Sequence, residues 1–93
     1  MFNDYDKQIF SEALDKWGED AQINMFHEEI GELLQALNKY RRGRIERQEL
    51  ISEVADVLIM LGQLMVMYPM EMSLTEEIGR KISRLVDRIN ERE

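Results

Sequence analysis

The stretch ERQELISEVADVLIMLGQLMVM, residues 46–67, decides the fold of this 93-residue chain. Its apolar side chains, from Val54 to Met67, cover most of the circumference of the helix that it would form. A helix that is apolar nearly all round is covered by neighbours on several sides. Because three other helices of so short a chain can hardly cover it completely, we expect part of it to face a second copy of the chain.

Glycines and the single proline divide the rest of the chain into three more periodic segments. We expect helices from about Asn3 to Trp17, from Asp20 to Arg42, and from residue 73 onward. Asp20 is expected to cap the second of these, and a capping box at residues 73–76, SLTE, to open the last. No stretch alternates apolar and polar residues as a strand does. The sequence therefore predicts one all-α domain over residues 1–93, a four-helix bundle completed by oligomerisation.

The spacing of apolar residues assigns an inward face to each of these three segments. The faces comprise Ile9, Phe10, Ala13, Leu14 and Trp17 in the first, Phe26, Ile30, Leu33 and Leu37 in the second, and Leu74, Ile78, Ile82, Leu85 and Ile89 in the last. Trp17 could instead stack on a nucleobase, but its spacing favours a core position. Gln22 could read the edge of a base, and a plain exposed glutamine is an equal alternative.

Composition narrows the classes of function. A net charge of −7 argues against a protein that binds nucleic-acid phosphates. The absence of cysteine excludes a thiol nucleophile and a zinc ribbon, and it fits a reducing compartment such as the cytoplasm. The N-terminus has no apolar run that would indicate a signal peptide. The longest apolar run, residues 57–61, is far shorter than the roughly 20 residues that a bilayer requires, so we expect no contact with a membrane.

Two pairs of acids interrupt the predicted helices where a packed face is expected. Glu29 and Glu32 lie three residues apart in the second segment, and Glu53 and Asp56 lie three apart in the third. Antiparallel packing through a turn at Gly43 would bring the pairs face to face at the same height. Four such carboxylates would either have raised pKa values or hold a divalent metal ion. Oxygen ligands select hard ions, Mg²⁺, Mn²⁺ or Ca²⁺.

Other interpretations of the polar residues stay open. The pair Glu28 and Glu32, taken alone, is typical of a solvated helix face. A di-iron site is excluded, because it would need two Glu-x-x-His motifs and the single histidine, His27, has Asn24 three residues before it. His27 is expected to be exposed. The basic run from Lys39 to Arg47 could attract an anion or cap the second helix, and capping is slightly favoured. A general base could be Glu28 or Glu32, which the sequence does not separate.

The acidic motifs resemble those of a known family. The runs Glu28-Glu29-Ile30-Gly31-Glu32 and Glu53-Val54-Ala55-Asp56 are similar to the paired signature of the MazG-like nucleotide pyrophosphohydrolases, an all-α group of NTP pyrophosphatases. The flanking runs at residues 17–22, 39–43 and 55–60 resemble small phage-type and prokaryote-type members. Gln63 stands where many members have asparagine, and Leu85 replaces a second basic residue near the end of the last helix.

The resemblance implies a MazG-like bundle that forms a homodimer or homotetramer and hydrolyses a (d)NTP to a (d)NMP and pyrophosphate with Mg²⁺, with Mn²⁺ as an alternative ion. It implies that Glu29, Glu32, Glu53 and Asp56 are the metal ligands. It also implies that two residues of the last helix, Lys81 and Arg84, contact the phosphates. The alternative is a non-catalytic helical oligomer, a degenerate family member that binds nucleotides or a partner.

Overall fold

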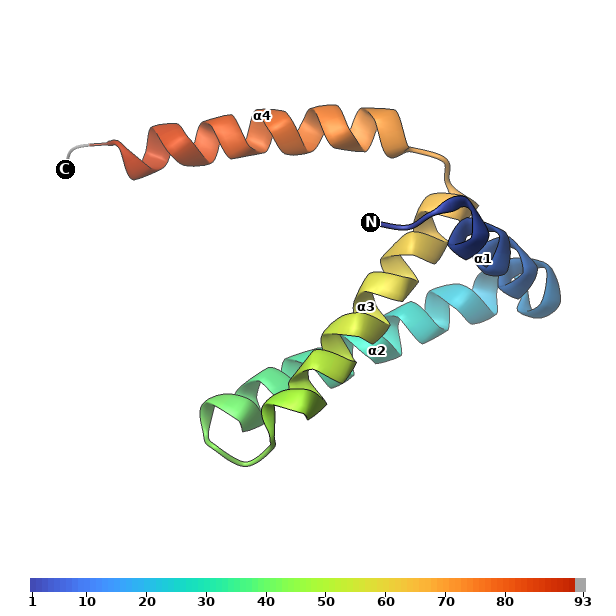
Figure 1. Ribbon diagram of the computed structural model, residues 1–93, viewed down its shortest axis with the longest axis horizontal. Helices are drawn as coiled ribbons and strands as arrows, with labels where there is room; N and C mark the ends of the chain where they lie inside the picture. The colour runs from blue at the N-terminus through green and yellow to red at the C-terminus, as the bar shows by residue number, and fades with distance from the viewer. Residues whose placement is uncertain (92–93) are drawn as a thin grey trace.

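The computed structural model describes residues 1–91. These residues form four α-helices and no strand: α1 (Asp4–Trp17), α2 (Glu19–Arg41), α3 (Arg47–Met67) and α4 (Glu71–Ile89) (Figure 1). The predicted all-α class is confirmed. The helices break near Gly18, Gly43 and Pro69, as the sequence indicates.

The start of α2 differs from the prediction. Gly18, with a φ of 85°, both ends α1 and precedes the first residue of α2. The prediction that Asp20 caps α2 was wrong, because the left-handed backbone of Gly18 turns the chain within one residue and the helix resumes at Glu19. The cap with side-chain hydrogen bonds is instead on α1, where the Asn3 side chain accepts a bond of 2.8 Å from the Asp6 N–H.

The start of α4 also differs. The helix begins at Glu71, so the predicted capping box at residues 73–76 was wrong. Pro69 ends α3, and the chain returns to helix two residues later, before it reaches Ser73. The carboxylate of Glu71 lies 2.9 Å from Lys7 Nζ, an ion pair that holds the first turn of α4 against α1. The Thr75 hydroxyl donates to the Glu71 carbonyl one turn back, as inside a continuous helix.

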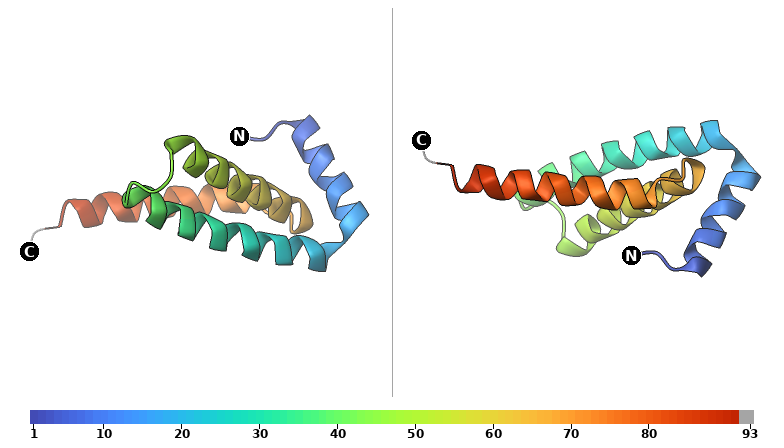
Figure 2. Two further views of the ribbon diagram at one scale, coloured as in Figure 1. Left: turned by 90° about the horizontal axis from the view of Figure 1, so that it is seen from below. Right: turned by 90° about the horizontal axis from the view of Figure 1, so that it is seen from above.

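The packed part of the chain is a hairpin of α2 and α3, with α1 crossing the end of α3 (Figure 2). Phe10 of α1 packs against Gly62 of α3 so closely that a Cβ atom on Gly62 would lie 2.6 Å from the ring. Among the described residues, the buried apolar side chains are those of Phe10, Ala36 and Met60. So small a core indicates that a single chain leaves much of its apolar surface uncovered.

Helix α4 carries a continuous stripe of that uncovered surface. It diverges from the hairpin and packs along none of the other three helices. Its apolar stripe was predicted to face inward, but within one chain the stripe is exposed beyond Leu74, and Ile82 is 55% exposed. The helix is amphipathic, and the described residues leave its apolar face uncovered.

The apolar faces predicted for α1 and α2 are also partly uncovered. Trp17 is 59% exposed, so the prediction that it is a core residue was wrong: it stands at the corner between α1 and α2, beyond the end of the packed interface. In α2, the buried residues are Gln22 and Ala36, and Leu37 is exposed. Because Glu29 lies midway between Gln22 and Ala36, α2 turns an edge that contains polar residues toward α3.

Helix α3 is long and apolar enough to cross a membrane, by length and composition only. An 18-residue window of α3 has a mean hydropathy of 1.8, and 11% of that window is buried. The uninterrupted apolar run at residues 57–61 is therefore a poor measure of how apolar the whole of α3 is. The central helix of a water-soluble assembly meets the same criterion, so the expectation of no membrane contact stays a prediction.

Candidate metal centre

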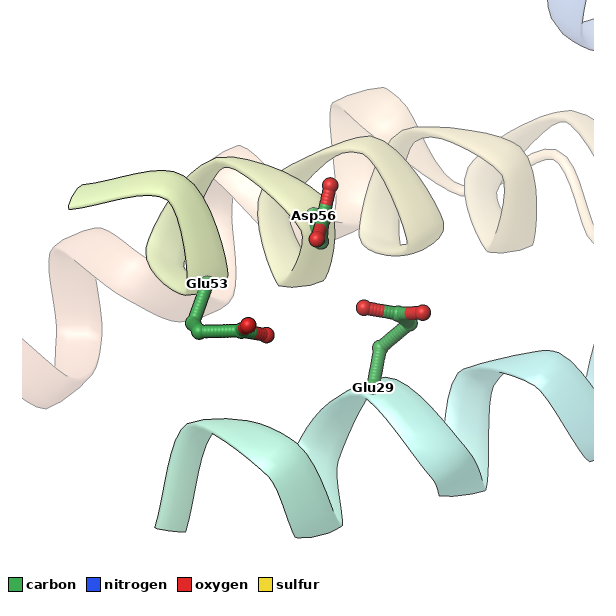
Figure 3. A group of neighbouring side chains, drawn as sticks. All are labelled: Glu29, Glu53 and Asp56. Carbon is green, nitrogen blue, oxygen red and sulfur yellow. The ribbon is translucent and has the colours of Figure 1, made fainter. Parts of the chain in front are cut away.

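Three carboxylates converge between α2 and α3. Glu29, Glu53 and Asp56 each offer one oxygen, and these oxygens all lie within 4.8 Å of one another. Figure 3 shows Glu29 reaching from α2 toward Glu53 and Asp56 on α3. Glu53 and Asp56 share a face of α3 because residues three apart are neighbours on a helix. The antiparallel hairpin then places Glu29 opposite them.

The fourth predicted ligand lies at the edge of this group. Glu32 is exposed, and its oxygens are not among the three that converge. Its charge is nonetheless close enough to raise the pKa values of Glu29 and Glu53. The structure therefore brings three of the four predicted acids together and leaves Glu32 beside them.

The cluster is electrostatically costly as it stands. Burial raises the pKa of Glu29, and the neighbouring charges of Glu32 and Asp56 raise it further. Burial and the same two neighbours also raise the pKa of Glu53. The Oε2 atoms of Glu29 and Glu53 are buried and lack a hydrogen-bond partner. A buried acceptor without a partner is destabilising, and a cation among these oxygens would remove that cost.

No basic side chain in residues 1–91 neutralises the cluster. The ion pairs there join Lys7 to Glu71 and Arg80 to Glu77, and none involves the three acids. All the converging atoms are carboxylate oxygens, the donors that Mg²⁺, Mn²⁺ and Ca²⁺ prefer. The residues present therefore fit a hard divalent cation.

The structure places the two candidate bases differently. Glu28 is exposed on α2 and is absent from the group of neighbours that raise the pKa values of Glu29 and Glu53. Glu32 belongs to that group, so it is the better placed of the two. His27 is exposed, as predicted.

Two glutamines lie along the same interface. Gln22 is only 5% exposed, so the alternative of a plain exposed glutamine was wrong. Gln63 on α3 has a buried Oε1 atom without a hydrogen-bond partner. Gln22 stands seven residues before Glu29 and Gln63 seven after Asp56, so each lies two helical turns from the acids on its own helix. The sequence does contain a signal for Gln63. It lies two helical turns after Asp56 and therefore on the same face of α3, which predicts an interface position.

The other predicted substrate contacts lie elsewhere. Lys81 and Arg84 are exposed on α4, which diverges from the hairpin, so one chain does not bring them to the acids. Trp17 is at the corner of α1 and α2, with Lys16 Nζ 5.4 Å from the centre of its ring. The substrate-binding roles of these three residues stay predictions.

A small hollow lies directly beside the acids. It has a volume of about 150 Å³ and lies between α2, α3 and the turn that joins them. Its lining comprises Glu32, Gln35, Ala36, Lys39, Ile45, Glu49 and Glu53. The spacing of residues in the sequence does not predict this hollow, because its shape depends on how the turn folds back over the hairpin.

Comparison with known proteins adds no further assignment. No protein-family model, curated protein or solved structure matches the chain. The resemblance to the MazG-like pyrophosphohydrolases therefore depends on the motifs in the sequence, and membership of that family stays a prediction.

Proposed function

We propose that this chain is a Mg²⁺-dependent nucleoside triphosphate pyrophosphohydrolase that converts a (d)NTP to a (d)NMP and pyrophosphate, with Mn²⁺ as a substitute ion. One observation carries the proposal: Glu29 and Glu53 each bury a carboxylate oxygen without a partner, inside a group of three acids. Structural carboxylates in a bundle are normally paired. Converging carboxylate oxygens without hydrogen-bond partners are typical of a metal-binding site.

Glu29, Glu53 and Asp56 would hold the ion, with Glu32 beside them. A divalent ion bound there would withdraw charge from the phosphates and make a bound water more acidic. The acids are half-buried rather than enclosed, which leaves a route for a phosphate group from solvent. The site also needs no covalent nucleophile, and the exposed His27 is the only histidine.

The reaction requires a base to take one proton from water. The water oxygen forms a bond to one phosphorus of the α–β anhydride, and the bond from that phosphorus to the bridging oxygen breaks. Pyrophosphate and nucleoside monophosphate separate, and the proton passes to a carboxylate. We assign this role to Glu32, because it adjoins the cluster and is exposed to water.

We also propose that the active form is a homodimer or homotetramer. A groove of about 930 Å³ lies between α1, α3 and the first two turns of α4, and it is lined largely by apolar side chains. The rest of the α4 stripe, with Ile82 and Leu85, is exposed. A second copy supplies both a matching groove and a matching helix. Lipid is a poorer partner for α3, because Glu53 and Asp56 lie in its apolar stretch and charge is costly in hydrocarbon.

The alternative is a non-catalytic oligomer that binds nucleotides or a partner. It is favoured by one observation: the helix that carries Lys81 and Arg84 lies away from the acids within a chain. In the enzyme proposed here, those residues reach the phosphates through assembly of two or more copies. The chemistry at the acids is otherwise unchanged.

Pyrophosphate release from a panel of ribonucleoside and deoxyribonucleoside triphosphates tests the proposal. Release is expected with Mg²⁺ and not with EDTA. The panel includes canonical nucleotides and nucleotides with damaged bases. No release from any of them, with either Mg²⁺ or Mn²⁺, would support the non-catalytic alternative instead.

A further inference from the structure

The hollow beside the acidic cluster combines two opposite kinds of group. Glu32 and Glu53 link it to the candidate metal centre, and Glu49 adds a third acid. Lys39 is the only basic residue in its lining. The hollow therefore extends from the candidate metal ligands to a lysine near the end of α2.

Lys39 forms no ion pair with the acids around it. In residues 1–91 no ion pair within 4.0 Å includes its ammonium, although three carboxylates share the same hollow. The lining thus combines three acids with the exposed ammonium of Lys39, which forms an ion pair with none of them. A metal ion on the acids and a lysine beyond it are together complementary to a polyphosphate, whose oxygens bind both.

We infer that Lys39 binds the phosphate groups of the metal-bound nucleotide, so that the polyphosphate lies along the hairpin toward the turn at Gly43. This inference depends on the proposed function, because it needs a metal ion at Glu29, Glu53 and Asp56. It assigns the hollow to the pyrophosphate part of the substrate. It also gives each chain a phosphate contact of its own, independent of Lys81 and Arg84 on α4.

Backbone hydrogen bonds, and not the Lys39 ammonium, close the end of α2. The end of α2 is closed by backbone groups: the Arg42 N–H donates to the carbonyls of Asn38 and Lys39, and the Arg44 N–H donates to Lys39. The carbonyl of Lys39 takes part in this cap, and its ammonium does not. Lys39 and Arg41 both lie in the last turn of α2, where a cation interacts favourably with the helix dipole, so this predicted role is common to the two residues.

Inorganic pyrophosphate in the presence of Mn²⁺ is the probe. Its affinity is measured by calorimetry for the wild type, for Lys39→Gln and for Arg41→Gln. Arg41 is the matched control, because it is an exposed cation of the same basic run that does not line the hollow. Both variants lose one charge, so diffuse attraction of the anion changes equally in the two.

We expect Lys39→Gln to weaken pyrophosphate binding roughly tenfold, as for the loss of one charge-assisted hydrogen bond, and Arg41→Gln to change it less than about twofold. Equal weakening in the two variants, or no weakening in either, would overturn the inference.

Binding of Mn²⁺ without pyrophosphate separates the two proposals. If the wild type binds Mn²⁺ but no pyrophosphate, the inference about Lys39 fails and the metal centre stands. If it binds no Mn²⁺, the proposed function fails, and the inference with it.

Discussion

The carboxylate of Glu29 on α2 lies beside that of Asp56 on α3, with oxygens of the two within 4.8 Å of each other. Gln22 and Gln63 each lie two helical turns from these acids along their own helices, Gln22 buried and Gln63 with a buried Oε1 atom. A row of polar side chains thus occupies an interface that apolar residues could fill. Acids in such a row cost stability, which points to selection for binding.

The acidic cluster should make the metal-free protein less stable as pH rises. The pKa values of Glu29 and Glu53 are raised above the ordinary 4.5, so the folded protein binds more protons than the unfolded chain between 4.5 and the raised values. The contribution of these protons to the free energy of unfolding is fully present below pH 4.5. It is lost as pH rises through the raised pKa values of the folded state.

Glu53→Gln isolates this effect, because the amide imitates a permanently protonated carboxyl. Both proteins are melted in EDTA from pH 4.5 to pH 8. The melting temperature of the variant should rise relative to that of the wild type as pH increases. A difference in melting temperature that stays constant with pH would show that Glu53 does not titrate abnormally.

At pH 7 without metal, Glu53→Gln should melt at the same temperature as the wild type or higher. The substitution removes one of several mutually repelling charges and keeps the volume of the side chain. The control is Glu12→Gln, which removes an exposed acid from α1, outside the cluster. If Glu53 is instead a structural hydrogen-bond acceptor, its loss should cost roughly 1–3 kcal/mol of stability.

The contact between α1 and α3 predicts opposite effects for two glycines. A Cβ atom at Gly62 would lie 2.6 Å from Phe10 and 2.8 Å from Phe2, so Gly62→Ala should displace both rings and lower stability by about 1–3 kcal/mol. At Gly31, in the middle of α2, a Cβ atom meets nothing within 4 Å. Gly31→Ala should therefore raise stability by about 0.5–1 kcal/mol. Urea denaturation measures both, and equal effects would contradict the packing described for α1.

The exposed stripe of α4 predicts assembly of two or four chains. Light scattering after size exclusion should give that mass at micromolar concentration, without added lipid or detergent. Leu85→Asp should shift the mass toward one chain, because it places a charge in the apolar stripe. Asp87→Asn changes a neighbouring exposed acid and should leave the mass unchanged. A folded wild-type monomer would contradict the proposed assembly. A protein that stays in solution only when lipid is added would indicate that the apolar stripe of α4 binds a membrane.

Much of the fold could be predicted because its signals are local. Gly18, Gly43 and Pro69 break the helices whatever surrounds them, and helical periodicity fills the segments between. The caps were predicted less well: Asp20 and Ser73 have suitable side chains, but each helix begins before it reaches them. The position of α4 depends on which surface covers it, and the sequence of one chain contains no local signal for that.

The candidate site was predictable to the extent that spacing determines it. Glu53 and Asp56 lie three residues apart, and Glu29 lies on the opposing helix at a matching distance from the turn. That is sufficient to predict the cluster. The burial of Gln22 and the hollow at Lys39 depend on how α2 is rotated against α3. Apolar spacing predicted a face that includes Leu33 and Leu37; Leu33 is half-buried, Leu37 is exposed, and the buried residues lie on the edge with Glu29.

Titration of the protein with Mn²⁺, followed by electron paramagnetic resonance, tests the central claim most directly: that Glu29, Glu53 and Asp56 hold a divalent ion. The wild type should bind Mn²⁺, Mg²⁺ should displace it, and Glu53→Gln should bind it at least about tenfold more weakly, since one of three converging ligands is lost. Glu12→Gln should bind it as the wild type does. A wild type that binds no Mn²⁺, or a Glu53→Gln variant that binds it unchanged, would contradict the account.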